Sequence, residues 1–245
     1  MNAVLQCLIR VPKFSEFFQV ENLSELVVPS NSYSHGGALA LEFKTSLLEL
    51  YTMHDNPFNP RLLRSIIASK HSDFGTYSQQ DAHDFLINFL DGLHEDLNTA
   101  RRNNKQFTFP EPPDEEFNAH SKLGHREAAK LSWERHKLQN TSRIVDIFQG
   151  QFGTITSGIE TATARRNFEA FMCISVPVSN EKSTVQECYD KFQSEEVVSD
   201  WYDPINKIST KATQQIVVFK APRVLIIHLK RFKMDNFGMI SEKLR

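Results

Sequence analysis

The sequence has few of the features that mark secreted or membrane proteins. Its three cysteines, Cys7, Cys173 and Cys188, are widely spaced and odd in number, which excludes a disulfide framework and indicates a reducing compartment. No run of about 18 apolar residues is present, so we expect no membrane-spanning helix. No basic segment precedes the first apolar residues, so we expect no secretory signal. Together these absences predict a cytoplasmic protein.

The sequence also lacks a strong excess of charge of either sign. A net charge of −2 gives no general attraction to nucleic acid or to a membrane surface, so we expect no nucleic-acid partner. With 40% hydrophobic and 24% charged residues, the chain has the composition of a globular protein. Its 245 residues suffice to bury a core, and 19 phenylalanines indicate an interior rich in aromatic rings. We find no internal repeat.

Hydrophobic periodicity divides the chain into a helical first part and a strand-rich second part. Apolar residues recur at helical spacing in residues 2–9, 14–18, 39–53, 61–69, 78–98 and 125–138. A charged, proline-broken connector is expected near 101–118. From Ile144 the period changes to two, which predicts strands at 168–178, 215–219 and 224–232, and a hairpin turn at 234–238. The apolar run in 224–232 is typical of a strand buried on both faces. Helices followed by strands predict an α+β fold.

The stretch 78–98 gives the strongest helix signal. Apolar residues at positions 82, 86, 89, 93 and 97 predict one broad buried face. Ser78 fits an N-cap, and Asp81 three residues later fits a capping box. The first turn would then carry amide and carboxylate side chains, namely Gln79, Gln80, Asp81 and Asp84.

The residues of this stretch alone leave two interpretations open. Between His71 and Ala100 there is no Lys or Arg. One interpretation is a capped core helix whose acidic residues form a solvated face and complement the helix dipole. The other is a binding site for an extended cationic ligand.

Several motifs in order along the chain favour the second interpretation. Residues 77–86 (YSQQDAHDFL) resemble the glutamine-glutamine-aspartate motif of the ubiquitin-specific proteases, which are papain-like deubiquitinases. Further segments resemble other motifs of that family, namely residues 1–8 (MNAVLQCL), 148–152 (FQGQF), 168–172 (FEAFM) and 224–232 (VLIIHLKRF). Residues 93–98 (LHEDLN) and the FQGQF segment suggest the endosome-associated branch. The resemblance covers nearly the whole chain.

The resemblance implies a papain-like fold and a ubiquitin substrate. Residues 1–143 would form a helical thumb, and residues 144–245 antiparallel fingers and part of a palm, in a catalytic domain truncated at both ends. The implied activity is hydrolysis of isopeptide or peptide bonds at the C-terminal glycine of ubiquitin by a monomeric thiol protease. Asp81 and Asp84 would pair with arginines of the ubiquitin tail. Gln79 and Gln80 would order the tail or the cysteine loop, and His83 would hydrogen-bond at the site.

The family pattern places the catalytic groups outside these residues. The nucleophile would lie two positions before Met1, and the base histidine beyond Arg245, so we expect no catalytic residue here and an inactive chain. We expect Cys7 to be a buried structural thiol within its helix, and His228 to be packed or hydrogen-bonded. The alternative is a non-catalytic ubiquitin-binding protein, a pseudo-deubiquitinase or scaffold.

The family commonly carries two Cys-x-x-Cys pairs that hold zinc at the finger tip. Counted from the flanking motifs, these pairs should fall at Gly158 and Thr161, and at Asp203 and Asn206. None of these residues is a cysteine. We therefore expect no metal and no other cofactor, finger strands held by packing alone, and a mobile tip.

Overall fold

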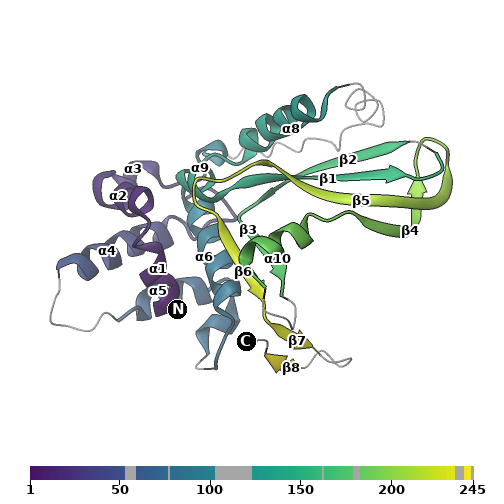
Figure 1. Cartoon of the computed structure of the whole chain (residues 1–245). Helices are drawn as coiled ribbons and strands as arrows, with labels where there is room; N and C mark the ends of the chain where they lie inside the picture. Colours follow the sequence, from purple (N-terminus) through teal and green to yellow (C-terminus); the bar gives the residue numbers. More distant parts are fainter. Residues whose placement is uncertain are drawn as a thin grey trace. The chain divides into compact units, whose positions relative to one another are not determined.

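The computed structural model of the protein describes residues 1–52, 59–76, 78–102, 123–161, 163–178, 183–234 and 240–243. The chain divides into two compact units. One comprises Met1–Thr108 and Arg135–Phe148, and the other comprises Phe109–Glu134 and Gln149–Arg245. Helices dominate the first half of the chain and strands the second (Figure 1). This order confirms the predicted α+β class.

The first unit is helical. Its elements are α1 (Asn2–Leu8), α2 (Pro12–Val20), α3 (Leu23–Leu26), α4 (Ala38–Thr52), α5 (Arg61–Ala68), η1 (Ser72–Gly75), α6 (Ala82–Asp96), η2 (Thr99–Arg101) and α9 (Arg143–Phe148). α8 (His125–Gln139) contributes its last residues to this unit. Pro12 is the first residue of α2, where its missing N–H costs nothing.

Phenylalanine rings packed against one another form the core of this unit. Phe14, Phe18, Phe43, Phe89 and Phe148 are fully buried. Phe43 lies 4.8 Å from Phe18 and 5.2 Å from Phe89 between ring centroids, both edge to face, and Phe14 lies 5.4 Å from Phe148. Such pairs contribute about 0.5–1.5 kcal/mol each beyond burial of their area. The cluster therefore ties α2, α4, α6 and α9 together and fixes the axis of α6.

Two helix predictions need correction. Strands were expected from Ile144, but Arg143–Phe148 is α9, and all of its apolar residues are buried. In so short a segment, apolar residues at positions 144, 145, 147 and 148 fit a helix as well as a strand. The helix expected at 61–69 ends one residue earlier, as α5 (Arg61–Ala68), and Pro60 is its N-cap.

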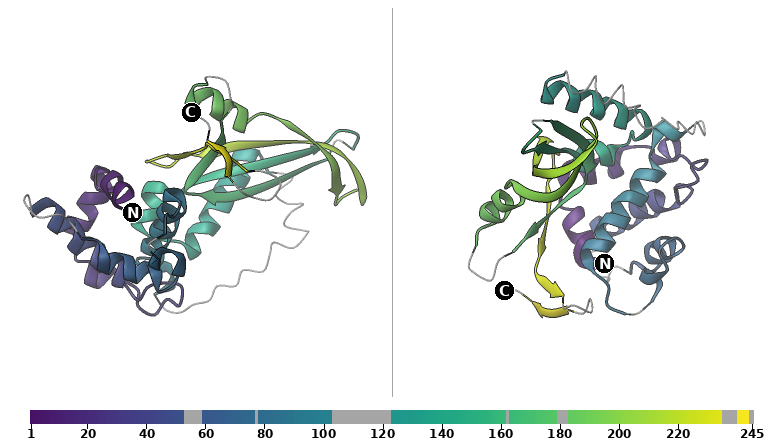
Figure 2. Two further views of the ribbon diagram at one scale, coloured as in Figure 1. Left: turned by 90° about the horizontal axis from the view of Figure 1, so that it is seen from below. Right: turned by 90° about the vertical axis from the view of Figure 1, so that its right-hand side faces the viewer.

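The second unit contains a four-stranded antiparallel sheet. Its strands are β1 (Gly150–Gly158), β2 (Ala164–Phe171), β4 (Glu196–Asp203) and β5 (Ile208–Lys220), in the order β2-β1-β5-β4. The strands run side by side in Figure 1 and in the left-hand view of Figure 2. Lys220 Nζ lies 3.6 Å from the centroid of the Trp133 ring, so α8 packs on the sheet through Trp133.

A smaller core lies beside this sheet. β3 (Cys173–Pro177) pairs in parallel with β6 (Ile226–Lys230), and α10 (Val185–Phe192) contributes Cys188. Ile174 and Val176 of β3 are buried with Phe171 of β2. Phe152 stacks on Phe171 with a centroid distance of 3.9 Å. Phe171 of the four-stranded sheet therefore shares one core with Ile174 and Val176 of the two-stranded sheet.

The strand predictions were right in type but wrong in detail. The expected strand 168–178 is interrupted at Met172 and contributes to two different sheets. The expected strand 224–232 is shorter, and its residues are half-buried or exposed rather than buried on both faces. Among the described strands β6 pairs only with β3, and the pairing is parallel although antiparallel strands were expected.

Some expectations fall outside the described residues. These are the connector after Arg102, the end of the helix expected at 39–53, Tyr77 and the turn between β7 (Phe232–Met234) and β8 (Ile240–Lys243). β7 and β8 do pair antiparallel, as a hairpin requires. In the part of the chain that the structure describes, no helix is both long and apolar enough to cross a bilayer. The assignment of thumb, fingers and palm stays a prediction.

Candidate functional site

The candidate site is built around the start of α6. Asp81 is the N-cap, in an extended conformation, and its Oδ1 accepts a hydrogen bond of 2.7 Å from the backbone N–H of His83. A carboxylate at this position pairs an unsatisfied N–H and complements the helix dipole. The prediction that Ser78 is the N-cap is therefore wrong, because Asp81 performs that role itself. Gln79 and Gln80 precede the helix instead of lying in its first turn.

Side-chain hydrogen bonds order the segment before α6. Gln80 Nε2 donates to the Asp73 carbonyl at 3.1 Å and to Ser78 Oγ at 3.0 Å. Thr76 Oγ1 donates to the same Asp73 carbonyl at 3.0 Å. These bonds join η1 to the residues that lead into α6. Gln79 is exposed, and no described residue hydrogen-bonds to its side chain.

A hollow of about 420 Å³ opens at this point. It is lined by Met1, Arg64, Phe74, Thr76, Ser78, Gln79, Gln80, Asp81, Ala82 and Phe85. Met1 is the N-cap of α1, so the starts of α1 and α6 flank the same space. The sequence interpretation requires this convergence, because the cysteine motif belongs to the first helix.

The structure brings together three of the five predicted site residues. Gln79, Gln80 and Asp81 line the hollow, whereas His83 and Asp84 are not among its lining residues. Asp84 has 69% of its side chain exposed, and its Oδ1 lies 3.7 Å from His83 Nδ1. His83 and Asp84 therefore form a pair of polar side chains on the first turn of α6, and neither lines the hollow.

Sequence reasoning missed the other walls of the hollow. Phe74 and Phe85 form an apolar wall, with ring centroids 5.5 Å apart and edge to face. Arg64 of α5 adds a cation, although 78–98 itself has none. The only sequence signal for Arg64 is its place on α5 next to the buried Leu63. The hollow thus combines one carboxylate, one guanidinium, amides and aromatic rings, and it can hold an extended peptide by its backbone and its side chains.

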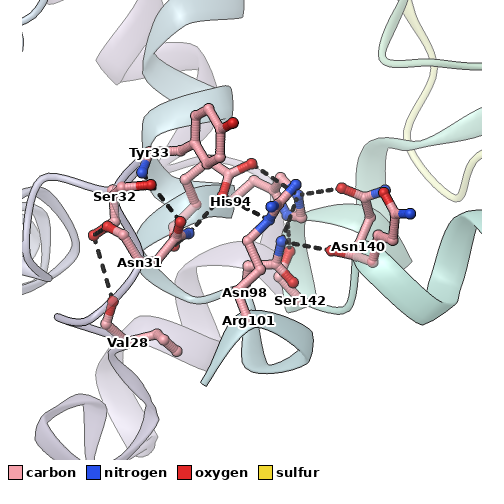
Figure 3. Close-up of polar contacts among 12 residues, drawn as sticks. Val28, Asn31, Ser32, Tyr33, His94, Asn98, Arg101, Asn140 and Ser142 are labelled. Carbon is pink, nitrogen blue, oxygen red and sulfur yellow. Dashed lines mark hydrogen bonds and ion pairs between the residues drawn. The ribbon is translucent and has the colours of Figure 1, made fainter. Parts of the chain in front are cut away.

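The opposite end of α6 is anchored by buried polar groups (Figure 3). His94 is 2% exposed, and its Nδ1 lies 2.7 Å from Ser142 Oγ. Its Nε2 lies 3.3 Å from Asn140 Oδ1. Burial lowers the pKa of His94, although Glu95 and Asn140 act in the opposite direction. The neutral ring therefore links α6 to the segment before α9.

A second set of contacts holds the 28–37 loop against this end of α6. Asn31 Nδ2 donates to the Glu95 carbonyl at 2.9 Å. The buried carboxylate of Asp96 accepts from the backbone N–H groups of His35 at 2.6 Å and Ala40 at 3.0 Å. Breaking such buried networks is costly, because the partner groups lose their hydrogen bonds. The anchored helix holds the residues of the hollow in place.

The cysteines do not have the surroundings of a nucleophile. Cys7 was expected to be buried, but it is exposed, because Val4, Leu5 and Leu8 take the inward positions of α1. Burial raises the pKa of the Cys173 thiol, and a backbone hydrogen bond from His228 only partly offsets this. Cys188 is buried. The expectation that His228 is hydrogen-bonded is confirmed, with Nδ1 3.2 Å from Ser175 Oγ.

The four positions where zinc ligands were expected do meet in space, but they do not suit the metal. Asp203 accepts hydrogen bonds from Asn206 and from Thr163, and Thr163 Oγ1 lies 2.8 Å from Thr161 Oγ1. A Cβ on Gly158 would lie 2.3 Å from Thr161 Oγ1. Structural zinc sites are closed by four ligands, mainly thiolates and imidazoles, whereas the four positions supply only one hydroxyl, one amide and one carboxylate. In the part of the chain that the structure describes, no group of three His, Cys, Asp or Glu residues could hold a metal. The expectation that packing alone holds the strands is wrong, because hydrogen bonds join the two turns.

Comparison with solved structures identifies the class of fold. The fold is similar to that of a chain in the SAGA Ubp8/Sgf11/Sus1/Sgf73 DUB module bound to ubiquitin aldehyde, with a TM-score of 0.68 and 20% identity over 100% of this chain and 47% of that chain. A second structure, of a SAGA DUB module bound to monoubiquitin, gives a TM-score of 0.67 at 19% identity over 98% of this chain and 47% of that chain. The fold is that of the papain-like ubiquitin-specific proteases.

Sequence comparison identifies the family. Residues 1–245 match the model of the family described as ubiquitin carboxyl-terminal hydrolase, and the chain belongs to that family. Ubiquitin carboxyl-terminal hydrolase 4 of Saccharomyces cerevisiae strain RM11-1a is 29% identical over 253 residues, covering 96% of this chain and 26% of that protein. Human ubiquitin carboxyl-terminal hydrolase 19 is 34% identical over 189 residues, covering 77% of this chain and 14% of that protein.

A third relative is also described as a ubiquitin carboxyl-terminal hydrolase. The probable ubiquitin carboxyl-terminal hydrolase 4 of Schizosaccharomyces pombe is 29% identical over 245 residues, covering 97% of this chain and 41% of that protein. The chain thus spans less than half the length of each of these relatives.

Proposed function

We propose that this chain forms the ubiquitin-binding part of a deubiquitinase that hydrolyses bonds at the C-terminal glycine of ubiquitin. The observation that carries the proposal is the convergence of Met1 and Gln79–Asp81 on one hollow. The family pattern places a nucleophilic thiol just before Met1, beside the polar start of α6. A peptide held along α6 would then present its end to that thiol for acylation, and water would release the product.

Recognition of the ubiquitin tail follows from the groups at the start of α6. Asp81 uses Oδ1 to cap the helix, and its Oδ2 is directed to an arginine of the tail. Asp84, with its exposed carboxylate, takes a second arginine, because carboxylate–guanidinium pairs are the strongest of such contacts. Gln79 holds the tail backbone through its amide. Gln80, bound to Asp73 and Ser78, orders the loop, and His83 hydrogen-bonds beside Asp84.

None of the three cysteines acts as the nucleophile in this proposal. Thiolates form at helix N-termini or beside cations, whereas Cys7 lies near the C-terminal end of α1. Cys173 has a raised pKa and Cys188 is buried. Residues 1–245 on their own therefore bind ubiquitin without cleaving it.

The alternative is a non-catalytic ubiquitin-binding protein or scaffold. It is favoured by a different observation, namely that no described cysteine has the surroundings of a nucleophile. The two functions differ only in whether a thiol from outside residues 1–245 acts at the hollow. A ubiquitin-based thiol probe applied to the longest natural product distinguishes them, because only the deubiquitinase forms a covalent adduct.

Binding affinity for ubiquitin tests the proposal directly. Asp81→Asn keeps an N-cap oxygen but loses the charge, so it should weaken binding by about tenfold while the fold is retained. Asp146→Asn changes an exposed carboxylate on α9, outside the hollow, and should leave the affinity unchanged. Ubiquitin without its C-terminal tail should bind Asp81→Asn and Asp146→Asn with the same low affinity. Equal affinity of Asp81→Asn and wild type for intact ubiquitin would refute the tail assignment.

We also propose membership of the endosome-associated branch and a cytoplasmic location. The LHEDLN segment at 93–98 and the FQGQF segment at 148–152 support the branch, and the three widely spaced cysteines support the location. Fluorescence imaging of the tagged protein with an endosomal marker tests this, and a uniform distribution without enrichment on endosomes would contradict it.

A further inference from the structure

Two turns meet at the far end of the four-stranded sheet. One turn joins β1 to β2, and the other joins β4 to β5; they lie together at the right-hand end of the sheet in Figure 1. The backbone N–H of Gly158 donates to the Thr163 carbonyl at 2.8 Å, and that of Ile159 donates to the Lys211 carbonyl at 2.9 Å. Backbone contacts therefore close the first turn and attach it to β5.

Asp203 organises the second turn. Its Oδ1 accepts from the backbone N–H groups of Ile205 at 2.8 Å and Asn206 at 3.1 Å, an arrangement in which an Asp side chain closes a turn. Its Oδ2 accepts from Asn206 Nδ2 at 2.8 Å. The residue is 0% exposed. A buried carboxylate needs several donors of this kind to remain charged.

Thr163 carries the connection between the two turns. Its hydroxyl donates to Asp203 Oδ2, and it lies 2.8 Å from the hydroxyl of Thr161. Burial raises the pKa of Asp203, but hydrogen bonds from Thr163, Asn206 and Thr161 outweigh it and lower the pKa overall. The carboxylate thus stays ionised at neutral pH, and both of its oxygens are occupied.

We propose that Asp203, Thr163, Thr161 and Asn206 form a metal-independent clasp that closes this end of the sheet in place of a zinc site. The four positions where the family resemblance implies zinc ligands are the positions that build or border the clasp. A metal ion there would have to displace the hydrogen bonds to both oxygens of Asp203 and would gain no thiolate. The clasp orders the two turns, so the tip is fixed without metal.

Hydrogen exchange of the two turns in the full 245-residue chain tests the clasp. In Asp203→Asn, amides in residues 157–164 and 203–208 should exchange at least about tenfold faster than in wild type, because local opening follows the lost hydrogen bonds. Thr163→Val, which keeps the shape and removes the bridging hydroxyl, should speed exchange mainly in 157–164. Asp200→Asn, an exposed carboxylate on the same strand, serves as the matched control and should match wild type.

Removal of metal provides the second readout. Treatment with a zinc chelator should leave exchange in both turns unchanged, and elemental analysis of the purified chain should find no stoichiometric zinc. Stoichiometric zinc, or faster exchange of these turns after chelation, would overturn the proposal. Exchange in Asp203→Asn equal to that in Asp200→Asn would overturn it as well.

Discussion

Met1 and Asp81 are the N-cap residues of two different helices, and both line the same hollow. α1 carries the segment that resembles the family's cysteine motif, and α6 begins within the segment that resembles the glutamine-glutamine-aspartate motif. The phenylalanine cluster and the polar anchor around His94 fix α6 in the first unit. The hollow therefore has its polar groups in place before any ligand binds, which reduces the entropic cost of binding.

Asp81 has a structural role that can be separated from its proposed binding role. Asp81→Ala removes the acceptor for the His83 N–H and should lower the free energy of unfolding by about 1 kcal/mol. Asp81→Asn keeps an acceptor and should stay within about 0.5 kcal/mol of wild type. Urea denaturation measures both changes. Equal destabilisation by the two variants would show that the cap does not depend on the side-chain oxygen.

Gly92 in the middle of α6 permits close packing of the 28–37 loop and α4. A Cβ at this position would lie 2.7 Å from Leu39 Cδ2 and 3.1 Å from His35 Nε2. Gly92→Ala should therefore destabilise the protein by about 1–3 kcal/mol through overpacking, despite the better helix propensity of alanine.

A double-mutant cycle with Leu39→Ala tests this explanation. Leu39→Ala removes the clashing carbon, so the double variant should cost less than the sum of the two single changes. Strict additivity of the two free-energy changes would mean that the clash with Leu39 is not the cause.

The anchor at the C-terminal end of α6 should be sensitive to acid. Burial lowers the pKa of His94 below its usual 6.5, so the unfolded chain binds more protons than the folded chain as the pH falls through that value. The stability due to the neutral ring is present above pH 6.5 and is lost below it. Wild type should lose on the order of 1 kcal/mol between about pH 7.5 and 5.5. His94→Gln should show a smaller loss, and an unchanged pH slope in this variant would contradict the role of His94.

Labelling with two thiol reagents should distinguish a cysteine that is merely exposed from one that acts as a nucleophile. Cys7 is exposed and Cys188 is buried, so under native conditions iodoacetamide should modify Cys7 first and Cys188 only after unfolding. A ubiquitin-based thiol probe should nevertheless leave residues 1–245 unlabelled. Labelling that disappears in Cys7→Ser would show that Cys7 is a nucleophile and would refute our assignment.

The sequence predicted features that depend on local periodicity and composition. Helical spacing located α6 and part of its buried face: Phe89, Leu93 and Leu97 are buried, whereas Ala82 is exposed and Leu86 is half-buried. The count of phenylalanines indicated the aromatic core. The start of α6 was placed too early because Ser78 and Asp81 both suit an N-cap, and only the fold selects between them.

Features that depend on distant contacts could not be predicted in this way. Arg64 lines the hollow because α5 lies beside η1 and α6, which no local pattern shows. The alternation through 168–178 continues across Met172, although the chain there changes from one sheet to another. The clasp joins Thr163 to Asp203 across forty residues of sequence, so counting from flanking motifs located the positions but not their hydrogen bonds.

The most direct test of the central claim is an NMR titration of the 245-residue chain with ubiquitin. We predict that intact ubiquitin shifts the backbone amides of residues 78–85 and of Arg64, and that ubiquitin without its C-terminal tail leaves these amides unshifted. Shifts confined to other parts of the chain, or identical shifts at 78–85 with tail-less ubiquitin, would contradict the account.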